Sequence, residues 1–172
     1  MPLPTFQELM DAEVSTGGGP PVPEGFYNAV ITGAEVRGGL KGPYIAFETT
    51  IHGDGDDDEY RGRKVWRNSS FSEKARHMPG GISEVFQATK PDVDMDTPRE
   101  ELPAVLAAAV LHSPVVIEVE HEQKQNREGV DQFNMDGSPA LRGVVSSFTA
   151  PQDDFIGTIK AEAAGLDDDL PF

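Results

Sequence analysis

The chain has 172 residues, a formal net charge of −16 and 37% hydrophobic residues, which fits one domain with a modest core and tails. Cysteine is absent and no apolar run is long enough to span a membrane, so disulfides, thiolate chemistry and a membrane partner are excluded. Because residues 1–10 also lack the basic start and apolar stretch of a signal peptide, we expect a cytoplasmic protein.

The N-terminal residues are expected to lie outside the folded core. Residues 5–12 have the spacing of a short helix. Residues 15–24 are rich in Gly and Pro, which predicts a linker without regular structure. We therefore divide the chain into an N-terminal segment (1–22), a central domain (23–150) and an acidic C-terminal tail (151–172).

Three strands are expected at the start of the central domain. Alternating side chains predict strands over residues 25–36 and 44–52, with Gly33 at a bulge or bend of the first. The acidic residues 53–59 form a solvated loop, and a third strand follows over residues 63–71. The three strands are expected to form a meander.

The middle of the chain is expected to be helical. A short helix over residues 82–88 precedes a clearer one after Asp96, where Thr97 and Glu100 fit a capping box. Pro103 lies inside this second helix, which leaves a later start open.

Two further strands complete the domain, over residues 115–121 and 141–148, with a long polar loop between them. Three strands, a helical insertion and two strands is the order of the OB-fold, a five-stranded, partly open barrel. We therefore expect a mainly β fold with an OB-fold-like barrel and helices between strands three and four. OB-folds bind oligonucleotides on strands two and three and on neighbouring loops.

The third strand carries positive charge in an otherwise acidic domain. Residues 24–150 hold 21 Asp and Glu against 13 Lys and Arg, whereas residues 60–77 hold six Lys and Arg against one Glu. Aromatic residues are interleaved with these cations. This composition suits a single strand of nucleic acid, because cations follow the phosphates and rings stack on the bases. The alternative is a surface strand with one buried Trp.

We expect this strand and the loop at residues 124–142 to hold single-stranded DNA. The stacking candidates are Tyr60, Trp66, Phe71 and Phe133, and the phosphate-binding candidates are Arg61, Arg63, Lys64, Arg67, Lys74, Lys124 and Arg127. Trp66 fits the core as well as the site, Phe71 fits the core better, and Phe133 fits the site better. The neighbouring acidic loop would repel phosphate.

The sequence ends with Asp167, Asp168, Asp169, Leu170, Pro171 and Phe172. Three adjacent carboxylates repel one another and stay solvated. Phe172 is expected to carry a ring and a terminal carboxylate, which suits a partner pocket with an apolar slot and a basic mouth. A frayed acidic terminus is the alternative. Upstream, the apolar residues of 155–163 fit one face of a short helix.

This acid-acid-acid-aliphatic-Pro-Phe end closely resembles the C-terminal tip of bacterial and phage single-stranded DNA-binding proteins, which usually has Ile in the place of Leu170. The central domain looks like phage-encoded single-stranded DNA-binding proteins in the segments PEGFYNAVITGAEV, YIAFETTI, YRGRKVW and SPVVIEVEHE. The resemblance implies an OB-fold core that protects single-stranded DNA. It also implies a flexible tail whose tip recruits enzymes of replication, recombination and repair.

No catalytic or metal-binding motif accompanies these features. The histidines form no HExxH motif, and neither a nucleophile elbow nor a P-loop occurs. Asp54, Asp56 and Asp58 resemble the opening of a calcium loop, but its sixth and twelfth places hold Glu59 and Val65. We therefore expect no enzyme, no cofactor and no metal.

Two functional hypotheses follow. The first is a single-stranded DNA-binding protein of phage or prophage replication and recombination. The second is a β-rich phage structural or interaction protein whose acidic tail only aids solubility. The sequence leaves homo-oligomerisation open.

Overall fold

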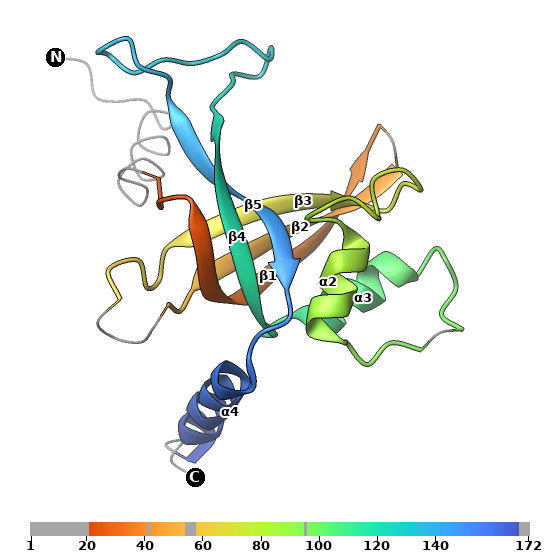
Figure 1. The fold of residues 1–172 in the computed structure, drawn as a ribbon. Helices are drawn as coiled ribbons and strands as arrows, with labels where there is room; N and C mark the ends of the chain where they lie inside the picture. The colour runs from red at the N-terminus through yellow and green to blue at the C-terminus, as the bar shows by residue number, and fades with distance from the viewer. Residues whose placement is uncertain (1–20, 41, 54–57, 95, 169–172) are drawn as a thin grey trace, which may run out of the picture.

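The computed structural model describes residues 21–40, 42–53, 58–94 and 96–168 (Figure 1). Five strands close a barrel in the order β1-β2-β3-β5-β4. This architecture is mainly β with added helices and is OB-fold-like, as the order of elements predicted. The expected helix at residues 5–12, and residues 54–57 of the acidic loop, lie outside the described residues.

The strands follow the expected order along the chain. Their bounds are Gly25–Gly39 for β1, Gly42–Ile51 for β2, Lys64–Ser70 for β3, Pro114–Gln123 for β4 and Leu141–Thr149 for β5. All pairs are antiparallel except β3 with β5, which closes the barrel where Trp66 pairs with Val144. The register of β1 shifts between Ile31 and Gly33, so the bulge predicted at Gly33 is confirmed.

The core fills the inside of the barrel by strict alternation. In β2, Ile45, Phe47, Thr49 and Ile51 point inward and are buried. The buried hydroxyl of Thr49 donates a 2.7 Å hydrogen bond to the carbonyl oxygen of Val65, so its polar group is satisfied. The ring of Phe47 meets that of Phe148 edge-on, with centroids 5.8 Å apart.

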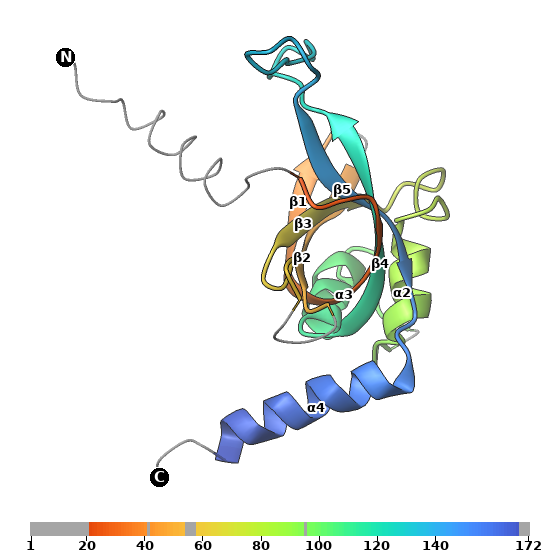
Figure 2. The same cartoon turned by 60° about the vertical axis from the view of Figure 1, so that its left-hand side comes forward.

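Two helices lie between β3 and β4 in sequence. α2 (Ile82–Thr89) packs against β4 and β5, and α3 (Leu102–Val110) packs against β1 and β2 (Figure 2). The expected capping box after Asp96 is wrong, because the hydroxyl of Thr97 donates back to the carbonyl oxygen of Asp94 at 2.6 Å instead. The helix begins later, at Leu102, because proline is tolerated only in the first turn of a helix and Pro103 must lie there.

The expected tail is helical over most of its length. α4 (Asp153–Asp168) follows β5 and runs below the barrel in the view of Figure 2. Its first turn carries Phe155, which is 6% exposed. This part of the chain therefore starts from a packed anchor, which is a departure from the flexible tail that the sequence predicted.

The end of the expected N-terminal linker also packs on the barrel. Val22 is buried, and its carbonyl oxygen accepts a hydrogen bond from the Nε2 of His121 at 2.7 Å. The hydroxyl of Tyr27 donates to the carbonyl oxygen of Pro23 at 2.6 Å. Among the described residues, no helix is long and apolar enough to cross a membrane.

Candidate nucleic-acid interface

A groove of about 850 Å³ opens along β3 and β5. One wall comes from the β4–β5 arm, which we define as the outer ends of these two strands and residues 124–140 between them. The arm stands away from the barrel in both views (Figures 1 and 2). The groove therefore joins the third strand to the polar loop, the two regions that the sequence predicted to hold DNA.

Trp66 lies in this groove because of the alternation along β3. Val65 points into the barrel and is buried, so Trp66 points outward and is 54% exposed. Leu141 and Val144 of β5 line the groove with it. Trp66 thus does not belong to the core, and its ring is available for stacking on a flat ligand.

The charge of the groove is opposite to that of the whole chain. Its cationic side chains are Arg63, Lys64, Arg67, Lys124 and Arg142, against the single carboxylate of Glu122. Because charges within a concave site act together, this local excess attracts anions even on an acidic protein. Four of these five cations were predicted from the sequence.

Arg142 is the groove cation that the sequence analysis did not select. The register of β4 and β5 places it opposite Glu122, and its Nε donates to the Oε1 of Glu122 at 2.7 Å. Its position in β5, far from the basic stretch in sequence, gave no local signal. Only the pairing of the two strands brings it to the groove.

Lys64 is held by a carboxylate on the neighbouring strand. Its Nζ lies 3.1 Å from the Oε1 of Glu48. Burial raises the pKa of Glu48, but hydrogen bonds from Thr32 and Lys64 outweigh this effect and lower the pKa. Glu48 is therefore ionised at neutral pH and orients the ammonium group of Lys64.

Arg67 lines the groove and also joins three parts of the fold. Its guanidinium donates to the carbonyl oxygen of Pro79 at 2.9 Å and to that of Val145 at 3.4 Å. A Cβ added to Gly80, whose φ is +74°, would lie 2.8 Å from the Cζ of Arg67. The guanidinium therefore rests directly on Gly80 and connects β3 to the turn before α2 and to β5.

Six other candidates from the sequence do not line the groove. They are Tyr60, Arg61, Phe71, Lys74, Arg127 and Phe133. Tyr60 and Phe71 are half-buried against the core, as expected for Phe71. Phe133 is exposed on the β4–β5 arm, beyond the groove, where the arm is bridged between Phe133 and Pro139.

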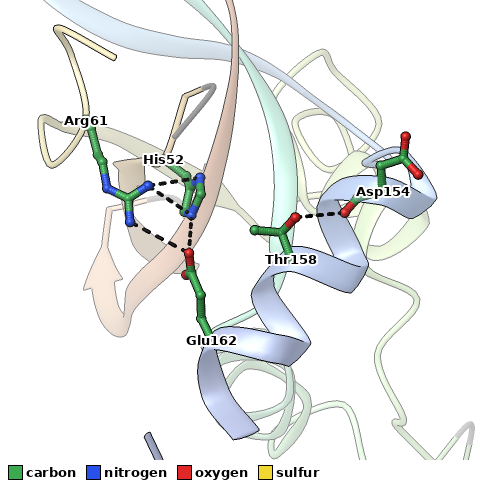
Figure 3. Close-up of polar contacts among 5 residues, drawn as sticks. All are labelled: His52, Arg61, Asp154, Thr158 and Glu162. Carbon is green, nitrogen blue, oxygen red and sulfur yellow. Dashed lines mark hydrogen bonds and ion pairs between the residues drawn. The ribbon is translucent and has the colours of Figure 1, made fainter. Parts of the chain in front are cut away.

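Arg61 faces α4 and not the groove. Its Nη1 lies 3.2 Å from the Nε2 of His52, and its Nη2 lies 3.7 Å from the Oε1 of Glu162 (Figure 3). The guanidinium is thus already engaged by a carboxylate of the chain itself.

The C-terminal candidates fall mostly beyond the described residues. Asp167 and Asp168 form the end of α4, and residues 169–172 lie outside the described part of the chain. Within the described residues, no group of three or more His, Asp or Glu side chains is placed to hold a metal ion. Neither a protein-family model nor a curated protein matches the sequence.

Proposed function

We propose that this chain is a single-stranded DNA-binding protein that acts without catalysis. The observation that carries the proposal is the exposed ring of Trp66 in a groove with five cationic side chains and one carboxylate. Stacking on base faces and neutralisation of phosphates are the two interactions that bind single strands irrespective of sequence.

The same groove disfavours duplex DNA as a ligand. In a duplex, the base faces are stacked on one another, so Trp66 has no free base to stack on. The chain as a whole carries a net charge of −16, which repels a large polyanion that extends beyond the groove. A flexible single strand can follow the groove and keep away from the acidic surface.

The role that we infer is in phage or prophage DNA replication and recombination, in a bacterial cytoplasm. In this proposal, the groove protects single-stranded DNA, and residues 167–172 recruit partner enzymes. The support for recruitment is the sequence of three carboxylates followed by Leu170, Pro171 and Phe172. Carboxylates speed the encounter with a basic rim, and an aromatic side chain in an apolar pocket prolongs the complex.

The proposal is tested by fluorescence anisotropy with a labelled oligo(dT) and a labelled duplex of equal length. We expect saturable binding to oligo(dT), at least tenfold weaker binding to the duplex, and loss of affinity for oligo(dT) as salt rises. Equal affinity for both ligands, or no binding to either at low salt, would contradict the proposal. The second result would favour a structural or interaction protein.

A further inference from the structure

α4 contacts the barrel at two points that lie two helical turns apart. The first is Phe155, whose ring centroid lies 5.2 Å from that of His52 in an edge-on arrangement. The second is Glu162, whose Oε1 lies 2.9 Å from the Nε2 of His52 (Figure 3). The two side chains are seven positions apart along the helix, so they share one of its faces.

His52 connects the two points. Its side chain is 11% exposed and lies at the end of β2, between the ring of Phe155 and the carboxylate of Glu162. The carboxylate of Glu162 can only accept, so the Nε2 of His52 donates to it. The Nη1 of Arg61 lies 3.2 Å from Nε2 and 3.5 Å from Nδ1 of the same ring. One imidazole ring thus serves an apolar contact and two polar contacts.

The rest of α4 buries no further side chain completely. Of its side chains at positions 153–163, Phe155 alone is buried, and Ile156 and Ile159 are half-buried. The hydroxyl of Thr158 donates to the carbonyl oxygen of Asp154 within the same helix, at 3.0 Å (Figure 3). Glu162 is the polar contact through which His52 and Arg61 hold the second half of α4 on the barrel.

We propose that α4 is a clasped arm. Phe155 anchors the arm beside its connection to β5, and Glu162 is the clasp that His52 and Arg61 hold. When the clasp is closed, the end of α4 is held at a fixed place on the molecule. When it opens, the helix swings about its anchor at Phe155, and its end at Asp168 moves over a radius of about 20 Å.

The clasp is suited to opening because it lies partly in solvent. The side chain of Glu162 is about half exposed, and that of Arg61 about one-third exposed. Charge pairs in such places are weakened by salt, whereas the buried ring of Phe155 is not. No residue of the clasp lines the groove, so opening of the clasp can be tested independently of DNA binding.

The test uses the absence of native cysteine. Lys160 on α4 and Glu120 on β4 are exposed, and Cys at both positions accepts two spin labels. Pulsed electron–electron double resonance then gives the distribution of distances between the two spin labels, one on the arm and one on the barrel. We expect one narrow distribution at low salt, which broadens at 1 M NaCl as the clasp opens.

Two variants identify the residues of the clasp. Glu162→Lys should broaden the distribution at low salt, because it places two cations together, and the double variant Arg61→Glu with Glu162→Lys should narrow it again. Ala161→Lys, a new lysine at a neighbouring exposed position, should leave it narrow. The proposal is overturned by a broad distribution in the labelled parent at low salt, or by a narrow one in Glu162→Lys. Because the salt series needs no substitution in the clasp, it decides the matter even where a clasp variant fails to fold.

Discussion

Trp66 occupies a position where a large apolar side chain has no structural role in the core. Its ring is 54% exposed, and the buried position beside it belongs to Val65. We predict that Trp66→Ala weakens binding to oligo(dT) by about 1–3 kcal/mol, the usual cost of losing one stacking ring. The melting temperature should fall less than in Val65→Ala, because Trp66 is half exposed and Val65 is buried.

The same residue provides a direct signal of binding. It is the only Trp in the chain, so intrinsic fluorescence reports on the groove alone. Quenching on addition of oligo(dT) is the expected result. Unchanged fluorescence at saturating oligo(dT) would remove Trp66 from the interface.

We expect Arg67 to contribute to the stability of the fold as well as to the charge of the groove. Its substitution by Ala removes the donors to the carbonyl oxygens of Pro79 and Val145. These bonds are exposed or partly buried, and a hydrogen bond of this kind contributes about 0.5–1.5 kcal/mol, so we predict a decrease of this size in the free energy of unfolding by urea. Lys64→Ala, on the exposed side of the same strand, is the matched control and should change it little. Equal stability of Arg67→Ala and the parent would contradict this structural role.

Glu162 should titrate below an ordinary glutamate. The hydrogen bond from His52 lowers the pKa of its carboxyl group. Burial opposes this effect, and the charges of His52 and Arg61 lower the pKa further. A depressed pKa means that the docking of α4 is favoured above the ordinary value of about 4.3 and is lost as the pH falls through the lowered pKa. NMR titration of the side-chain carboxyl carbon measures this directly. In His52→Ala the pKa should move back toward its ordinary value, and an ordinary pKa in the parent would contradict the contact.

At the level of elements, alternation was enough to predict the strands. Ile45, Phe47 and Ile51 in β2 follow period two, and the structure buries them all. The start of α3 was misplaced because a capping box is a local signal, whereas Pro103 restricts which turn of the helix can contain it. The pairing of β3 with β5 that closes the barrel joins residues distant in sequence, so no local sequence pattern predicted it.

The site was predictable only in part, for the same reason. The basic stretch extends beyond both ends of β3, so its residues divide between several environments. Lys64 and Trp66 reach the groove, whereas Arg61 lies beyond the strand and turns toward α4. Arg142 enters from another strand. The sequence predicted the helical spacing around Phe155. It could not predict the contact of Phe155 with His52, because that contact depends on the tertiary fold.

At the level of the whole molecule, we infer that the acids of the C-terminal segment compete with DNA for the groove. Residues 167–169 are three tethered carboxylates, and a tethered ligand has a high effective concentration. We predict that deletion of residues 167–172 tightens binding to oligo(dT) at low salt, and that the gain fades above about 0.3 M salt as the charges are screened. Replacing the three Asp with Asn should have the same effect. Weaker or unchanged binding after the deletion would show that the tail does not compete.

The groove is the central claim, and its electrostatic contribution is measured by the salt dependence of binding. The logarithm of the affinity for a single strand falls with the logarithm of salt concentration by about 0.7 for each phosphate neutralised. We compare a triple variant, Arg63→Ala with Lys64→Ala and Lys124→Ala, with a control triple at exposed cations outside the groove, Arg37→Ala with Arg99→Ala and Lys160→Ala. The groove triple variant should bind oligo(dT) more weakly, and its slope of log affinity against log salt should be less steep by about 2. The control triple variant should keep the parental slope. Equal slopes for the two triple variants would contradict the assignment of this groove as the DNA-binding site.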